Sequence, residues 1–266
     1  MSHHLADFAA KARSGQHLLS AWCHLSDPMA SEALAREAFD AIIFDMQHGQ
    51  LSLDAVMRSI PLVTALGKAA IARIPVGHFA ETSRLLDAGA SAVIAPMINT
   101  IEDAKRFASF MKFPPMGERS WGANRGLWMS GLKGTEYLTQ ANGFTLAIAM
   151  IETREALALV DDILNVPGID GVFVGPADLS IALNHGKKVD PLNPQVNDAL
   201  KHVIARAHAH KKLAWAYSVS GKRSAEMATW GLDLSAIMSD MGMLRAAAAI
   251  EIAAAKGVAA TNAAGG

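Results

Sequence analysis

Short apolar runs alternate with longer amphipathic segments along nearly the whole chain. Most of the short runs are continuously apolar, which is typical of strands buried on both faces of a parallel sheet. We therefore predict eight strands. They are His17–His24, Ala41–Gln47, Ala69–Ile74, Ala92–Met97, Thr145–Ile151, Gly171–Gly175, Leu213–Val219 and Leu234–Ser239.

The segments between these runs have helical spacing, and some begin with a capping residue, such as Thr100 and Thr153. The predicted helices are Pro28–Ala38, Leu53–Leu66, Phe79–Ala88, Ile101–Met111, Arg154–Leu164, Pro194–His210, Gly221–Trp230 and Met241–Lys256. Eight strands, each followed by a helix, favour a closed (β/α)₈ TIM barrel of the α/β class over an open doubly wound sheet. No glycine-rich nucleotide-binding loop follows the first strand, which argues against a nucleotide-binding fold.

The length of 266 residues suits one barrel domain. We expect an N-terminal helix in residues 1–16, the barrel in 17–256 and a flexible tail in 257–266. Two connections, Lys112–Gly143 and Asp178–Asn193, are much longer than usual. The first is rich in proline and glycine, and it is predicted to be a structured lid or binding loop.

Composition narrows the classes of function. The chain has 24 basic and 25 acidic residues and a formal charge of −1, so it lacks the excess of basic residues that would favour binding to nucleic acid or an anionic membrane. Its one cysteine, Cys23, excludes an intramolecular disulfide and reads as buried core. The sequence shows no signal peptide and no apolar stretch near the ~20 residues of a membrane span. We therefore expect a soluble, cytoplasmic protein.

Polar side chains follow several predicted strands at the point where each strand ends. Asp45 and His48 follow the second strand, Arg73 the third, Glu152 the fifth and Asp178 the sixth. Active sites of (β/α)₈ barrels lie at the carboxyl ends of the strands, so these side chains are predicted to meet at one mouth.

These residue types fit metal-assisted chemistry. Glu152 and Asp178 would supply two oxygen ligands to a hard divalent cation. Arg73 would stabilise a developing oxyanion, and His48, oriented by Asp45, would transfer a proton near neutral pH. Each carboxylate alone also fits a role at a helix start. Their convergence on one mouth favours metal binding and catalysis over a role at a helix start.

Seven segments carry a family resemblance over about residues 17–250. They are Phe44–His48, Arg73–Pro75, Leu85–Ala90, Pro96–Thr100, Pro114–Arg119, Ile151–Thr153 and Gly168–Ser180. In this order and spacing they resemble the metal-dependent class II pyruvate aldolases, which include 4-hydroxy-2-oxoheptanedioate aldolase and 2-dehydro-3-deoxyglucarate aldolase.

The resemblance implies a lyase that reversibly cleaves a 4-hydroxy-2-oxo acid to an aldehyde and pyruvate, or a related 2-oxo acid such as hydroxypyruvate, through an enolate that a metal stabilises. By matching position, Glu152 and Asp178 bind Mg²⁺, Mn²⁺ or Co²⁺. Arg73 stabilises the enolate, and His48, paired with Asp45, handles the proton. The partners are then small 2-oxo acids and aldehydes, with no nucleic acid and no membrane.

The resemblance also implies that the backbone near Ala177 holds the substrate carboxylate and that Trp22 lines the pocket. It implies a homo-oligomer, a hexamer built as a trimer of dimers, in which Asp87 reaches a neighbouring subunit's site. The chain departs from better-known members at Gln47, where they have glutamate, and at Met150, where they have glutamine. We count Gln47 among the substrate-binding residues, together with Arg73, Ala177, Trp22 and Asp87. The two changes put donor selectivity in question.

Two other functions stay open at this point. A CoA-thioester lyase of the citrate lyase β or malyl-CoA lyase type would share the metal carboxylates but needs a basic groove. Lys187-Lys188 is the one basic pair near the predicted mouth. A non-catalytic oxo-acid-binding protein would keep the metal site and lack turnover.

Overall fold

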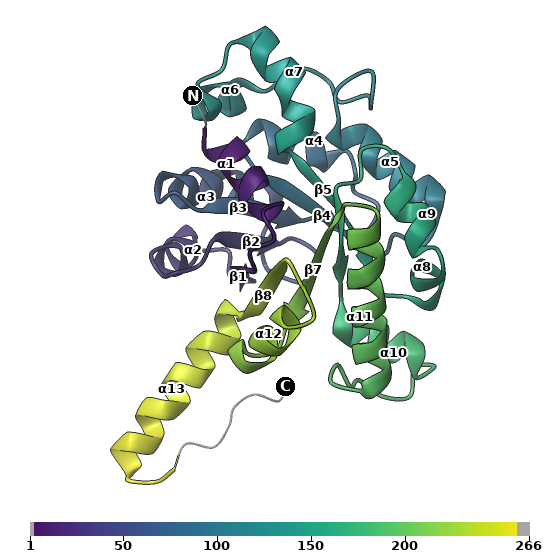
Figure 1. The fold of residues 1–266 in the computed structure, drawn as a ribbon. Coiled ribbons are helices and arrows are strands. Elements are labelled where there is room, and N and C mark those ends of the chain that lie inside the picture. The colour runs from purple at the N-terminus through teal and green to yellow at the C-terminus, as the bar shows by residue number, and fades with distance from the viewer. Residues whose placement is uncertain (1–2, 260–266) are drawn as a thin grey trace.

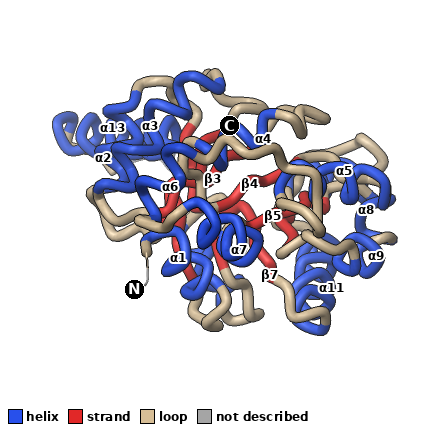
Figure 2. Tube along the Cα trace, turned by 90° about the horizontal axis from the view of Figure 1, so that it is seen from above, coloured by secondary structure: helices blue, strands red, loops and turns tan. Residues whose placement is uncertain are grey.

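Eight parallel strands close into a barrel in simple chain order in a computed structural model that describes residues 3–259 (Figure 1). Figure 2 shows the strands at the centre, surrounded by helices. The strands are β1 (Leu18–Cys23), β2 (Ala41–Asp45), β3 (Ala69–Arg73), β4 (Ala92–Ala95), β5 (Leu146–Ile151), β6 (Gly171–Val174), β7 (Leu213–Ser218) and β8 (Leu234–Ser239). The predicted single-domain (β/α)₈ barrel is confirmed.

The described helices cover the barrel wall and one of its ends. They are α1 (His4–Ala12), α2 (Pro28–Ala35), α3 (Leu53–Ala65), α4 (Glu81–Asp87), α5 (Ile101–Met111), α6 (Asn124–Ser130), α7 (Gly134–Phe144), α8 (Arg154–Ala158), α9 (Val160–Asn165), α10 (Pro176–Leu183), α11 (Pro194–Ala209), α12 (Gly221–Ala228) and α13 (Asp240–Lys256). The predicted helix Arg154–Leu164 is two helices that meet at Leu159. The two predicted loops contain α6, α7 and most of α10. Residues 260–266 of the predicted tail lie outside the described residues.

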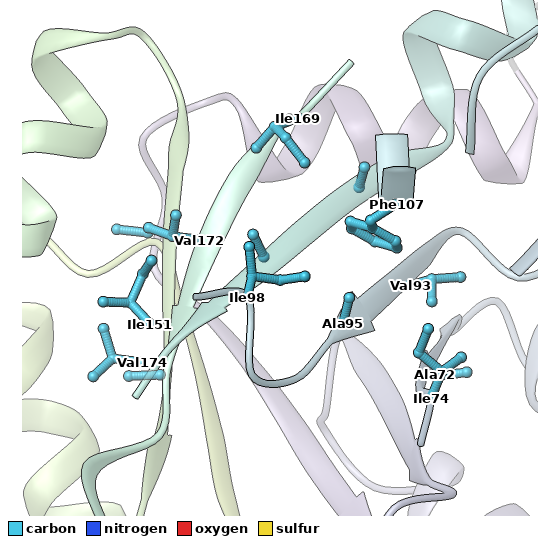
Figure 3. Packing of buried hydrophobic residues seen from close by; sticks show 14 of the residues in the cluster. Ala72, Ile74, Val93, Ala95, Ile98, Phe107, Ile151, Ile169, Val172 and Val174 are labelled. Atoms are coloured by element: carbon cyan, nitrogen blue, oxygen red, sulfur yellow. The ribbon is translucent and has the colours of Figure 1, made fainter. Parts of the chain in front are cut away.

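Strand side chains alternate between two apolar layers. Residues such as Ile43 and Ile71 fill the barrel interior, whereas their neighbours Ile42 and Ala70 face the surrounding helices. Figure 3 shows part of the outer layer, where strand residues pack with Phe107 of α5. This alternation decides which residues reach the mouth of the barrel.

The helix α1 closes the amino-terminal end of the barrel. Its Leu5, Phe8 and Ala12 belong to the same buried cluster as the interior strand residues. The segment 112–145 runs from the end of α5 to the start of β5, so both its ends lie at this amino-terminal end. The prediction that this segment is a lid is therefore wrong for the mouth of its own barrel, which opens at the opposite end.

One buried lysine anchors this segment. Lys112 is 1% exposed, and its Nζ donates to Asp170 Oδ2 at 2.6 Å and to the carbonyl oxygens of Asn142 at 2.9 Å and Thr145 at 2.5 Å. Burial lowers the pKa of Lys112, and the Asp170 carboxylate opposes that shift. Arg13 binds the other Asp170 oxygen at 3.0 Å. The network ties the first helix, the long segment and β6 together.

The last helix, α13, extends away from the barrel (Figure 1). It carries large exposed apolar side chains, namely Met241, Leu244, Ile250 and Ile252. Its start is held by buried Asp240, which accepts the main-chain N–H groups of His24 and Leu25. None of the helices within residues 3–259 is long and apolar enough to cross a membrane.

We expect Lys112→Met to destabilise the fold by about 3–5 kcal/mol, because it leaves buried acceptors and Asp170 without their cation. Urea unfolding measures the change. Lys105→Met is the matched control, since Lys105 is exposed and its nearest carboxylate is 3.9 Å away. That control should stay within about 0.5 kcal/mol of the parent. Equal stability of the two variants would contradict the anchoring role.

Candidate active site

A cavity of about 200 Å³ opens at the carboxyl ends of the strands. Its walls are formed by strand side chains that point inward, because every second residue of a strand faces the barrel interior. The lining residues are Trp22, His24, His48, Arg73, Met150, Phe173, Gly175, Pro176, Ala177, Asp178 and Tyr217. Most of the residues predicted to meet at one mouth therefore do so.

The most strongly bonded group beside the cavity is the ion pair of Asp45 and Arg73. Arg73 Nε donates to Asp45 Oδ1 at 2.8 Å and Nη2 to Oδ2 at 2.7 Å, and both side chains are buried. The guanidinium also lies over the Trp22 ring, 4.7 Å from its centroid. This two-point bond fixes the guanidinium plane and leaves Nη1 for a ligand in the cavity.

Asp45 accepts further hydrogen bonds. Oδ1 accepts from the main-chain N–H groups of Gln47 at 3.0 Å and His48 at 3.2 Å, and Oδ2 accepts from Trp22 Nε1 at 3.2 Å. Burial alone would raise the pKa of Asp45. The hydrogen bonds from His24 and Arg73 and the charge of Arg73 outweigh burial, and they hold that pKa far below its usual range. Asp45 is a permanent anion.

The imidazole bound to Asp45 is that of His24. His24 Nε2 lies 2.9 Å from Asp45 Oδ2, whereas His48 reaches Asp45 through its main-chain N–H. The predicted side-chain pairing of Asp45 with His48 is thus wrong in this geometry. His48 follows the end of β2, where the chain turns and alternation stops. Its side chain lines the cavity without bonding to Asp45.

Glu152 follows the end of β5 and lies against Gly175, one of the residues that line the cavity. It is 2% exposed, and Oε1 accepts the main-chain N–H of Met97 at 2.8 Å. Met97 has a φ of 53°, an uncommon left-handed conformation for a side-chain-bearing residue, and this aims its N–H at the carboxylate. Burial raises the pKa of Glu152, and the charge of Asp178 adds to that shift.

Gly175 provides the space that Glu152 occupies. A Cβ at this position would lie 2.7 Å from Glu152 Oε2 and 3.2 Å from Met150 Cε. Gly175 is in extended conformation, with φ at −91°, so packing rather than backbone strain selects glycine here. A side chain at this position would displace the carboxylate.

Asp178 stands in the first turn of α10 and faces the same cavity. Glu152 Oε2 forms no hydrogen bond among the described residues, and the nearby charge of Asp178 makes ionisation of Glu152 less favourable. A divalent cation would neutralise both, so the donor set fits one. No group of three or more His, Cys, Asp or Glu within residues 3–259 forms a complete metal site. The remaining coordination positions would be left to water or a ligand.

Ala177 and Trp22 line the cavity as predicted, but two predicted binding residues do not. The Gln47 side-chain oxygen is buried and has no hydrogen-bond partner among the described residues. Asp87 lies at the end of α4, away from the cavity, and accepts from Arg119 at 2.7 Å. Neither Gln47 nor Asp87 is among the residues that line this cavity, and their predicted binding roles stay predictions.

Two polar side chains of the cavity, those of His24 and Tyr217, were not predicted from the sequence. Both follow from alternation: Leu18 and Trp22 point inward, so His24 does as well, and Trp215 predicts Tyr217 in the same way. Tyr217 packs edge-on against Trp22 at 5.5 Å, and burial raises its pKa. Extending the alternation of inward and outward side chains past the end of each strand would have found both.

Residues 19–247 match the HpcH/HpaI aldolase/citrate lyase family. The chain is 40% identical over 242 residues to a hydroxypyruvate/pyruvate aldolase of Rhizorhabdus wittichii, covering 91% of this chain and 95% of the relative. It is 28% identical over 240 residues to a 5-keto-4-deoxy-D-glucarate aldolase of Escherichia coli, covering 90% and 93%. An HpcH/HpaI aldolase crystal structure from Desulfitobacterium hafniense superposes with a TM-score of 0.86 at 23% identity, covering 95% and 98%.

We expect Gly175→Ala to weaken binding of Mg²⁺ or Mn²⁺ by roughly 10–100-fold, because the new methyl group displaces Glu152. Thermal-shift titration with each metal measures the change. Gly221→Ala is the matched control, since a Cβ there meets nothing within 4 Å. Unchanged metal binding in Gly175→Ala would remove Glu152 from the metal site.

Proposed function

The chain belongs to the HpcH/HpaI aldolase/citrate lyase family, and on that basis we propose a divalent-metal-dependent aldolase. Its reaction is the reversible cleavage of a 4-hydroxy-2-oxo acid to an aldehyde and pyruvate or hydroxypyruvate. The observation that carries the proposal is the convergence of Glu152, Asp178 and the Asp45-bound Arg73 at one cavity. A cytoplasmic location stays a prediction.

The residues present match the demands of this reaction. Breaking the C3–C4 bond leaves an electron pair that is shared with the C2 oxygen, so negative charge develops there. A cation held by Glu152 and Asp178 would act as the Lewis acid for that oxygen. Arg73 adds a fixed guanidinium donor that is aimed into the cavity and needs no reorganisation.

The start of α10 suits the substrate carboxylate. Main-chain N–H groups in the first turn of a helix have no partner within the helix, and they favour anions. Ala177 is in that turn and lines the cavity. We assign the carboxylate to this backbone and the aldehyde portion to the side of Trp22. His48 lines the cavity between them and is proposed to transfer a proton.

The CoA-thioester alternative is less well supported. The cavity of about 200 Å³ is below the roughly 300–1,000 Å³ of pockets for larger ligands. Lys187 and Lys188 do not line it, and Lys188 is paired with Asp190 at 2.8 Å. A small oxo acid is the better fit.

We also propose a homo-oligomer, with a hexamer as the specific prediction. The exposed apolar side chains of α13 support it, because a helix that keeps them in water loses the stabilisation of their burial. Asp87 supports it as well, since the residue lies away from the cavity of its own chain. In an assembly it would serve a neighbouring copy.

The proposed function is tested with a panel of aldehydes and pyruvate or hydroxypyruvate, with EDTA and after Mg²⁺, Mn²⁺ or Co²⁺ is restored. We expect C–C bond formation that EDTA abolishes and a divalent metal recovers. Activity that EDTA leaves unchanged would contradict the metal-dependent mechanism.

We expect Glu152→Gln to lose activity by at least about 100-fold and to raise the melting temperature of the metal-free protein at pH 7. The sign follows from the raised pKa of Glu152: its contribution to stability is complete below the unfolded-state pKa and is lost as pH rises through the folded-state pKa. The gain should therefore shrink towards pH 4. Calorimetry across pH measures it.

Glu155→Gln is the control for this prediction, because Glu155 is exposed three residues further along the chain. It should keep both activity and melting temperature. A Glu152→Gln variant with full metal-dependent activity would sink the assignment of Glu152 as a ligand.

We expect Leu244→Glu to lower the oligomer mass measured by light scattering, because Leu244 is 60% exposed in the single chain and would be buried in the assembly. Val189→Glu, at a similarly exposed apolar site of 62%, is the control and should leave the mass unchanged. A monomeric parent protein would leave Asp87 without its proposed role.

A further inference from the structure

His24 occupies a position on the cavity wall that none of the predicted roles uses. It continues the inward-facing row of β1 directly above Trp22. Its side chain is 29% exposed, so one part is buried against Asp45 and another part is open. Its main-chain N–H is fixed by buried Asp240, at 3.0 and 3.1 Å.

The hydrogen bonds around His24 define its tautomer. Nε2 lies 2.9 Å from Asp45 Oδ2, and the Trp22 indole N–H has two competing acceptors, His24 Nε2 at 3.0 Å and the same Asp45 oxygen at 3.2 Å. The charge of Asp45 decides between them. A lone pair on Nε2 would face the permanent carboxylate, which is repulsive, so Nε2 carries a proton and donates it to Asp45. Trp22 then donates to the same oxygen, at 3.2 Å.

Nδ1 of His24 is consequently the basic nitrogen of the neutral ring. It has no hydrogen-bond partner within residues 3–259, and it is not among the buried polar atoms that lack one. Solvent or a ligand therefore reaches it. A carboxylate bound to one ring nitrogen and a free lone pair on the other is the arrangement of a general base.

We propose that His24 is a second proton-transfer residue of this site, which accepts the proton of the substrate's C4 hydroxyl during cleavage. The inference rests on the proposed aldolase function and assigns one of its two proton movements. His48 remains for the other, at C3.

The step balances in atoms and charge. The C4–O–H proton moves to His24 Nδ1, the C4–O bond becomes the aldehyde carbonyl, and the C3–C4 electron pair passes into the enolate. A proton delivered to C3 then gives pyruvate, and His24 returns its own proton to solvent. Asp45 stabilises the transient imidazolium, as Asp–His pairs do.

Several charged or titratable groups bond to His24 or share its cavity. They are Asp45 from β2, Arg73 from β3, His48 after β2, Asp178 from α10, Tyr217 from β7 and Asp240 at the start of α13. Asp45 bonds to both Arg73 and His24. One carboxylate therefore orients the proposed oxyanion donor, Arg73, and the proposed base, His24.

The test is His24→Gln in the metal-loaded enzyme, because the glutamine amide retains a donor for Asp45 and lacks a base. We expect kcat/KM for cleavage to fall by about 100-fold. We also expect the acid-side decline of kcat/KM, where protonated His24 cannot accept a proton, to disappear. Deuterium exchange of the pyruvate methyl group in D₂O, which forms the enolate without a C4 hydroxyl, should stay near the parent rate.

Two comparisons complete the experiment. His48→Gln should slow the methyl exchange, and His78→Gln, an exposed histidine paired with Glu81, should change neither reaction. If His24→Gln does not fold, His24→Ala with imidazole added to the buffer replaces it, and recovery of cleavage by imidazole supports the proposal.

Full cleavage activity in His24→Gln with an unchanged pH profile would overturn the proposal. Equal losses of cleavage and exchange would also overturn it, because His24 would then only support Asp45 and Arg73. A parent enzyme that shows neither reaction with any divalent metal fails differently: the aldolase function itself would be wrong.

Discussion

The buried ion pair between Asp45 and Arg73 sets the geometry of the whole mouth. Burying two charges is costly, and the arrangement is stable only because both carboxylate oxygens and two guanidinium nitrogens are bonded. Trp22 and His24 join the same carboxylate, so three strands meet at one anion. Any ligand in this cavity meets a guanidinium and an imidazole whose positions were fixed when the barrel closed.

On the opposite wall the charged groups are not paired with a counter-charge among the described residues. Glu152 and Asp178 are acidic groups without a full counter-charge, and burial makes the ionised form of Glu152 unfavourable. Arg73 thus has its counter-charge on one side of the cavity, whereas the carboxylates on the other side do not, so a cation would be drawn to Glu152 and Asp178. Met150 and Phe173 add apolar surface to the cavity lining and compete for neither charge.

The sequence was sufficient for the barrel, because continuous apolar runs and helical periodicity are local properties. It also located Glu152, Asp178 and Arg73, since strand ends are easy to find. It failed for Asp45, whose imidazole partner depends on which of His24 and His48 the closed barrel turns inward. It also gave a wrong lid for residues 112–145, although the predicted order of helix 101–111 and strand 145–151 already puts both ends of this segment opposite the mouth. The Lys112–Asp170 contact, which anchors the segment there, joins residues 58 positions apart and could not be read from a local pattern.

Asp240 connects two parts of the molecule that otherwise have little in common. Its carboxylate holds the main chain of His24 at the cavity wall, and Asp240 is also the first residue of the projecting helix α13. The cavity wall and the projecting helix are therefore joined through one carboxylate. A change that moves the start of α13 would also move the main chain of His24 at the cavity wall.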